Sequence, residues 1–294
     1  MTWEDGPCLA SVIRSCKGDL LLYETEARVL MASSSHPWPA LKGRYPFRLG
    51  TTSYIVPAPI LPNIRFLAPL VDEVEIVLFE SGREDNLPAP AEIAEMGALG
   101  EEQDLTYNIH LPTGLSLGTA DRAERHRACE TILRFCDRTQ PLGPSVWVLH
   151  LEEGGMDGPA SLEGWRERLR TSIRDLIGGG LDPSRTVVEN LGYPLEWIRP
   201  LVEESGLSWC LDVGHMLAAG EDLTAAFDAM KQGVEMIHLH GLMEGRDHRS
   251  AAAVPEEAWR TLRPYLAEYR GGLSVEVFSE EDLRTSLLAL EERL

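Results

Sequence analysis

Short apolar runs alternate along the chain with longer segments whose apolar residues recur at i, i+3, i+4 and i+7. The longer segments predict amphipathic helices, clearest over Arg122–Arg138, Leu162–Ile177, Leu223–Gln232 and Glu256–Tyr269. The short runs predict strands at Phe47–Thr51, Val74–Glu80, Leu105–Leu111, Ser145–Glu152, Thr186–Asn190, Ser208–Val213, Val234–His240 and Gly272–Phe278. Strands separated by helices favour parallel pairing with right-handed crossovers, and eight such units close a (β/α)8 barrel. Splitting or merging two segments would leave six units and an open sheet, but the count of eight favours the barrel.

Domain boundaries follow from where this alternation begins. Residues 47–294 are predicted to form one barrel domain, a length typical of this fold at about 250 residues. Residues 1–46 lack the repeat and include the loop-like stretch Ser33–Pro39, so we expect an N-terminal arm or linker there.

The charge balance narrows the class of partner. The formal net charge is -20, and the chain holds only three lysines. Nucleic-acid binding depends on cationic side chains that displace phosphate counterions, so a long DNA or RNA ligand is disfavoured and a small molecule is expected. The oligomeric state is not predicted.

The apolar runs and the cysteines of the chain indicate its cellular compartment. No apolar run approaches the roughly 20 residues of a membrane span, and no signal peptide is recognised, so a cytoplasmic location is expected. The five cysteines match no zinc knuckle or disulfide framework and fit a reducing compartment.

Acidic and imidazole side chains interrupt the apolar strands near their C-terminal ends. The carboxyl ends of barrel strands converge on one mouth, where active sites of this fold lie. Any one such histidine is more often a core residue than a ligand, but the joint placement predicts a site for a divalent cation with N and O donors, with zinc as the first expectation and manganese or iron also fitting. The strand-end residues are Glu80, His110, His150, Glu189, Asp212, His215, His238, His240 and Glu276.

His238 and His240 lie two residues apart on one strand, so both side chains project from the same face. Which of the two is the direct metal ligand stays open at this point.

The pattern resembles the xylose isomerase-like, or AP endonuclease 2-type, barrel superfamily from about Phe47 to the C-terminus. Sugar isomerases and epimerases of that superfamily hold one metal, and the resemblance implies Glu189, Asp212, His238 and Glu276 as its ligands. Its trinuclear zinc phosphodiesterases use further ligands, for which the counterparts are His110, His150, His215, Asp247 and His248. Asp247 and His248 are adjacent here, whereas the DNA-repair enzymes carry one residue between the two.

Five segments look more specifically like cobamide-remodelling phosphodiesterases of the same superfamily: Phe47–Tyr54, Ile60–Asn63, Val77–Glu80, Asn86–Pro88 and Asp247–Ser250. This resemblance implies a metal-dependent hydrolase that cleaves the nucleotide-loop phosphodiester of a cobamide, in corrinoid salvage. The products would be cobinamide phosphate and an α-riboside.

Roles follow from that resemblance and from the chemistry of adjacent divalent metals. Glu189, Glu276 and His248 are the expected catalytic residues, with Glu189 bridging two metals as a possible general base. The expected substrate contacts are Tyr54, Glu80, His240, Arg246 and Arg249.

Three other functions compete with this prediction. A mononuclear sugar isomerase or epimerase needs one metal and glutamates acting beside a carbonyl. A DNA-repair endonuclease conflicts with the acidic surface. A barrel that only binds a corrinoid or sugar phosphate would form no product.

Overall fold

Eight parallel strands close into a barrel in the computed structural model, which describes residues 38–80, 84–152, 159–230 and 233–294. The order around the barrel is β1-β10-β7-β6-β5-β4-β3-β2, so the first and last strands of the chain pair and leave no edge. The predicted (β/α)8 architecture is confirmed. The strands are β1 (Arg48–Thr52), β2 (Glu73–Val77), β3 (Thr106–His110), β4 (Trp147–Leu149), β5 (Thr186–Glu189), β6 (Ser208–Asp212), β7 (Val234–Leu239) and β10 (Gly272–Val275).

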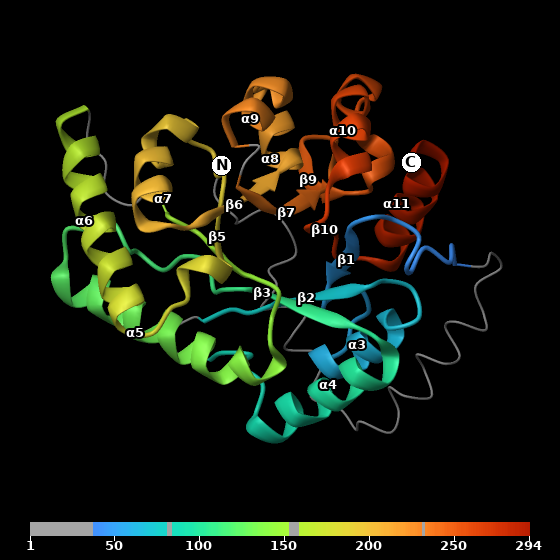
Figure 1. Ribbon diagram of the computed structural model, residues 1–294, viewed down its shortest axis with the longest axis horizontal. Helices are drawn as coiled ribbons and strands as arrows, with labels where there is room; N and C mark the ends of the chain where they lie inside the picture. Colours follow the sequence, from blue (N-terminus) through green and yellow to red (C-terminus); the bar gives the residue numbers. More distant parts are fainter. Residues whose placement is uncertain (1–37, 81–83, 153–158, 231–232) are drawn as a thin grey trace.

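Helices connect the strands and form an outer layer around the barrel (Figure 1). They are α3 (Ile60–Leu67), α4 (Pro90–Gln103), α5 (Arg122–Thr139), α6 (Pro159–Gly178), α7 (Arg199–Ser205), α8 (Val213–Ala219), α9 (Leu223–Met230), α10 (Glu256–Glu268) and α11 (Glu280–Arg293). Among the described residues, no helix combines the length and apolarity required to cross a bilayer.

Two elements at the barrel mouth lie largely outside the predicted strands and the helices with the clearest periodicity. Helix α8 follows β6 directly, and Asp212 caps it by accepting a hydrogen bond from the His215 backbone N–H. A two-stranded antiparallel hairpin, β8 (Gly241–Met243) and β9 (Arg246–Arg249), follows β7. Both bring histidines to the mouth, because they begin where the barrel strands end.

The polar residues near the ends of the predicted strands lie at or just beyond the ends of the observed strands. The predicted strands overlap the observed ones but extend further, most at Ser145–Glu152, where only Trp147–Leu149 is strand. His150 therefore lies just beyond its strand. Polar side chains gather at this end because the barrel ladder stops there and the interior opens into the mouth.

The barrel interior is partly polar. On β2 the apolar Val74 and Ile76 alternate with Glu73 and Glu75, and all four are buried. Alternate residues of a strand point to opposite faces, so the two glutamates share the interior face. Glu73 bonds there to Arg48, Thr106 and Asn108, which satisfies its carboxylate.

The predicted N-terminal arm is described only from residue 38. Residues 1–37 lie outside the described residues. Trp38 makes an edge contact with Phe66 of α3 at 5.4 Å between ring centroids, and Leu41 is fully buried. This part of the predicted arm therefore packs against the barrel.

Candidate metal centre

Four side chains from four strands meet inside the mouth of the barrel. Glu189 ends β5, Asp212 ends β6, His238 lies near the end of β7 and Glu276 follows β10. One potential ligand atom of each lies within 4.8 Å of those of the other three, and all four residues are buried. These residues lie up to about ninety positions apart in the sequence, and closure of the barrel brings them together.

The His238 ring shows which atoms face the centre. Its Nδ1 lies 3.2 Å from Glu276 Oε2, 3.5 Å from Glu189 Oε2 and 3.8 Å from Asp212 Oδ2. Neither His238 Nδ1 nor Glu276 Oε2 has a hydrogen-bond partner among the described residues. Buried polar atoms without partners are costly, and three carboxylates around one imidazole nitrogen match the donor set of a divalent cation. The residues present therefore fit a metal.

A second set shares Glu189. His110 Nε2 lies 3.3 Å and His150 Nε2 3.0 Å from Glu189 Oε2, and the ligand atoms of all three lie within 4.8 Å of one another. Each ring has a partner at its other nitrogen. His110 Nδ1 lies 3.0 Å from the Leu111 carbonyl, and His150 Nδ1 lies 3.4 Å from Glu152 Oε1. These contacts place the Nδ1 proton on both rings and aim Nε2 at Glu189.

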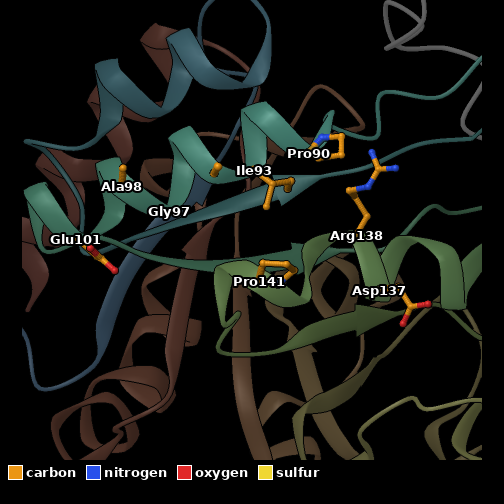
Figure 2. A pocket seen from close by; sticks show the side chains of 9 residues that line it. Pro90, Ile93, Gly97, Ala98, Glu101, Asp137, Arg138 and Pro141 are labelled. Carbon is orange, nitrogen blue, oxygen red and sulfur yellow. The ribbon is translucent and has the colours of Figure 1, made fainter.

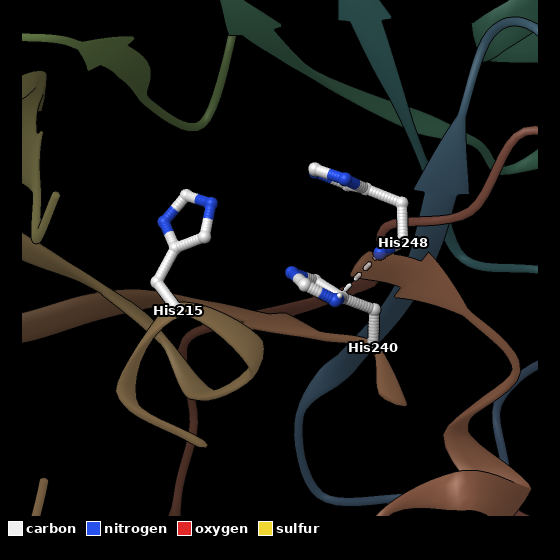
Figure 3. Close-up of side chains that lie close together, drawn as sticks. All are labelled: His215, His240 and His248. Atoms are coloured by element: carbon white, nitrogen blue, oxygen red, sulfur yellow. Dashed lines mark hydrogen bonds between the residues drawn. The ribbon is translucent and has the colours of Figure 1, made fainter. Parts of the chain in front are cut away.

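His215, His240 and His248 form a third set at the outer part of the mouth (Figure 3). The backbone N–H of His248 donates to His240 Nδ1 at 3.0 Å. His240 Nδ1 is therefore an acceptor and Nε2 carries the proton, which points at Asp212 with Nε2 3.2 Å from Oδ1. In this arrangement His240 supports Asp212, whereas His238 faces the carboxylates directly.

Gly214 leaves the space that the His240 ring occupies. A Cβ at position 214 would lie 2.0 Å from His240 Cε1. Only glycine lets α8 start this close to the imidazole.

Charge pairing sets the protonation of the cluster. Burial alone would raise the pKa values of Glu189 and Glu276, but adjacent imidazoles hold both pKa values well below their ordinary value. For Glu189 these are His150 and then His238, and for Glu276 they are His238 and then His248. Both glutamates are therefore carboxylates, able to bind a cation or accept a proton.

A surface hollow of about 540 Å³ lies away from this cluster. It sits on the outer helical layer between α4 and the end of α5, and Pro90, Ile93, Asp137 and Pro141 are among its lining residues (Figure 2). None of the predicted site residues lines it. The predicted site residues therefore lie at the barrel mouth and not at this hollow.

A family model described as "Xylose isomerase-like TIM barrel" matches residues 71–293. The chain belongs to this family. A search of curated proteins returns no match.

Solved structures of the same fold include several sugar epimerases. D-Psicose 3-epimerase from Clostridium cellulolyticum H10 aligns with a TM-score of 0.66 at 17% identity, over 84% of this chain and 98% of that one. 3-Keto-D-glucoside 4-epimerase from E. coli aligns with a TM-score of 0.63 at 16% identity, over 84% and 98% of the two chains. D-Allulose 3-epimerase from Methylomonas sp. gives 0.60 at 14% identity, over 87% and 100%. At these identities the likeness shows the fold of this family member.

The predicted hydrolase is wrong, because the structural neighbours of this barrel are mostly sugar epimerases and isomerases. The prediction depended on histidines beyond the four-residue set. Three of them have protein partners at both ring nitrogens: His110, His150 and His240. Hydrogen bonds to protein groups account for these imidazoles, so their number does not by itself require several metals.

The remaining predicted residues lie around the mouth or on its rim. The Tyr54 hydroxyl accepts a hydrogen bond from Asn86 at 2.7 Å, and Glu80 forms an isolated bridge with Asp85. On β9, Arg249 lies 3.5 Å from Asp282 and Arg246 is exposed.

The neighbouring Asp247 and His248 contact each other. Asp247 Oδ1 lies 3.2 Å from His248 Nδ1. The hydrogen bond to His248 is the main reason that the pKa of Asp247 falls to about 2. His248 has a φ of +51°, so a non-glycine residue adopts a left-handed backbone at the metal centre.

Sequence reasoning missed two carboxylates beside the site histidines. Glu152 follows His150 by two residues and accepts a hydrogen bond from the Gly114 backbone N–H in a loop, but it also contacts His150 Nδ1. Glu75 was passed over in favour of Glu80, although it interrupts an apolar strand. The available signal was its spacing of two from Glu73, which puts both side chains on the interior face.

The metal-free protein is expected to be most stable between about pH 4.5 and 6.5. Burial would lower the pKa of His150, but Glu189 and Glu152 outweigh it and raise this pKa to about 10. A raised histidine pKa contributes stability that is complete below about 6.5 and is lost as the pH rises towards 10. The depressed pKa values of Glu189 and Glu276 contribute stability that is present above about 4.5 and is lost below it.

Thermal unfolding in chelator from pH 4 to 10 measures this profile. Replacing His150 with glutamine should reduce the alkaline limb, to which the raised pKa values of His215, His238 and His248 also contribute. It should also reduce the acid limb, because His150 lowers the pKa of Glu189. A melting temperature that stays constant from pH 6.5 to 9.5 in the metal-free wild type would contradict the expectation.

Proposed function

We propose that this protein is a metal-dependent sugar isomerase or epimerase that holds one catalytic divalent cation with Glu189, Asp212, His238 and Glu276. The observation that carries the proposal is the convergence of these four buried side chains within 4.8 Å at the mouth of a closed barrel. The epimerases named among the structural neighbours support a ketose or a keto-sugar as the substrate class.

Isomerisation and epimerisation both remove a proton from a carbon next to a carbonyl. Isomerisation returns a proton to the neighbouring carbon, and epimerisation returns one to the opposite face of the same carbon. A cation in the four-residue site would polarise the carbonyl and hydroxyl oxygens of the sugar. Glu189 and Glu276 supply the proton-transfer groups, since both are carboxylates from different strands that approach the His238 Nδ1 position. Their low pKa values keep both groups ionised, which a proton acceptor must be, and both side chains are buried.

The outer histidines belong to the same site in this proposal. His240 holds the Asp212 carboxylate, whereas His215 Nδ1 lies 3.1 Å from the Asn190 carbonyl and 3.3 Å from Glu189 Oε1. Tyr54, Glu80, Arg246 and Arg249 are proposed as contacts for the hydroxyl groups of the sugar. Zinc, manganese and iron all fit mixed N and O ligands, so the native metal is tested by titration.

Solvent exchange gives a direct test. The protein, loaded separately with Mn²⁺, Fe²⁺ or Zn²⁺, is incubated in D2O with D-fructose, D-tagatose and D-psicose, and NMR follows both deuterium at the carbon next to the carbonyl and new sugars. We expect exchange with at least one ketose. Glu276→Gln should lower that rate by about 10²–10⁴-fold, the usual contribution of a general acid or base.

Metal counting on the same samples gives the second measurement. The proposal expects one tightly bound metal per chain. Loaded protein that exchanges no ketose proton, or that holds two or three metals per chain, would contradict it.

A further inference from the structure

Glu75 is a buried carboxylate whose surroundings do not explain it. Its side chain is 0% exposed, and neither oxygen has a hydrogen-bond partner among the described residues. Glu73, two positions earlier on the same face, is equally buried but bonds to Arg48, Thr106 and Asn108. Burying a carboxylate without hydrogen-bond partners is costly. Hydrogen bonds inside the barrel therefore do not account for Glu75 as they do for Glu73.

Among the described residues, His238 is the imidazole within ion-pair distance of Glu75, across the barrel interior, and a His110 ring nitrogen lies within 4.8 Å of a Glu75 oxygen. Glu75 Oε1 lies 3.5 Å from His238 Nε2, on the opposite side of the ring from the carboxylates at Nδ1. Strands β2 and β7 are separated around the barrel by β1 and β10, so this contact spans the interior. His238 is itself 0% exposed, so solvent cannot replace Glu75 at Nε2.

A metal-bound histidine needs its ligand nitrogen deprotonated and its ring held in one orientation. The other ring N–H usually donates to a carboxylate or carbonyl, which fixes the tautomer and raises the basicity of the ligand nitrogen. His150 shows the same arrangement nearby, with Glu152 at Nδ1 and Glu189 at Nε2. The 3.5 Å separation is long for a hydrogen bond, and such contacts shorten in loaded sites.

We propose that Glu75 is the positioning residue of the metal centre, which accepts the Nε2–H of His238 and so presents its Nδ1 lone pair to the cation. The inference rests on the proposed metal site but not on the sugar reaction. It gives the second interior glutamate of β2 a role that Glu73 does not share.

Zn²⁺ affinity of three single variants tests the proposal. Zn²⁺ is titrated against a competing chelator in the wild type, Glu75→Ala, Glu75→Gln and the matched control Glu73→Gln. Loss of such an outer carboxylate typically weakens metal affinity about 10–100-fold, which is expected for Glu75→Ala. Glu75→Gln keeps a carbonyl acceptor of the same size and should recover part of the loss. Glu73→Gln should lower the melting temperature but leave the Zn²⁺ Kd within about twofold, as its partners lie below the site.

Histidine ¹⁵N spectra of the loaded proteins provide a readout that a packing defect would not produce. The wild type should show His238 protonated at Nε2 and bound through Nδ1, and Glu75→Ala should lose this single tautomer. If Glu75→Ala fails to fold, Glu75→Gln supplies the same measurements.

Two results would overturn the proposal. One is an unchanged Zn²⁺ Kd and His238 spectrum in Glu75→Ala and Glu75→Gln. The other is loss of a whole equivalent of Zn²⁺, which would make Glu75 a direct ligand in the set that it forms with His110, His238 and Glu276. Neither readout uses a sugar, so an inactive wild type would refute the proposed reaction and leave this inference intact.

Discussion

Replacing Glu189 with alanine is expected to abolish metal binding and turnover while the barrel still folds. Glu189 belongs to the four-residue set and also faces His110, His150 and His215, so its removal withdraws negative charge from four imidazoles at once. The remaining imidazoles can stay neutral, and the β5 ladder does not depend on this side chain. Metal content by mass spectrometry, circular dichroism and ketose turnover measure the three parts of the expectation.

Two comparisons make this result specific. Glu189→Gln keeps the side-chain volume and should bind metal nearly as poorly, which assigns the loss to charge. Glu203→Ala on α7, where the carboxylate is exposed, should match the wild type. Full metal content and turnover in Glu189→Ala would refute the assignment of the centre.

Removing the metal is expected to cost the protein about 4 kcal/mol of stability when the free metal was held at about a thousandfold its Kd. For a domain of this size each kcal/mol shifts the melting temperature by about 2–4 °C, so chelation should lower it by roughly 10 °C. The physical reason is the repulsion between the Glu189, Asp212 and Glu276 carboxylates, which a divalent cation neutralises.

Differential scanning calorimetry at pH 7 with and without chelator measures the change. Asp212→Asn should melt at the same temperature in both conditions, because it lacks a ligand charge. A wild-type melting temperature that does not respond to metal would contradict the proposed centre, since a ligand that binds only the folded state must stabilise it.

The cluster contains two kinds of histidine, which is how a site with so many imidazoles is compatible with the proposed single metal. His238 presents a nitrogen without a hydrogen-bond partner to three carboxylates. His240 and His150 use both nitrogens on protein groups. Partner geometry, more than residue type, separates the proposed ligand from its supports.

Much of the fold could be read from the chain alone. The alternation of apolar runs with helical spacing predicts eight βα units, and parallel strands with right-handed crossovers leave little choice but a closed barrel. The same logic predicts the proposed metal centre. Glu189, Asp212, His238 and Glu276 lie at or near strand ends, and all carboxyl ends of barrel strands meet at one mouth. Local periodicity and chain direction are enough for this level of description.

The tertiary structure decided what each polar group faces. Glu75 meets His238 across the barrel, between strands that are not neighbours, so no spacing along the chain encodes the contact. In the hairpin after β7, the His248 backbone N–H donates to His240 Nδ1. The proton of the His240 ring is therefore on Nε2, which faces Asp212. Hydrogen bonds and metal ligation depend on differences of a few tenths of an ångström in atoms brought together by closure. Sequence pattern specifies faces and ends of elements, whereas these distances exist only once the barrel has closed.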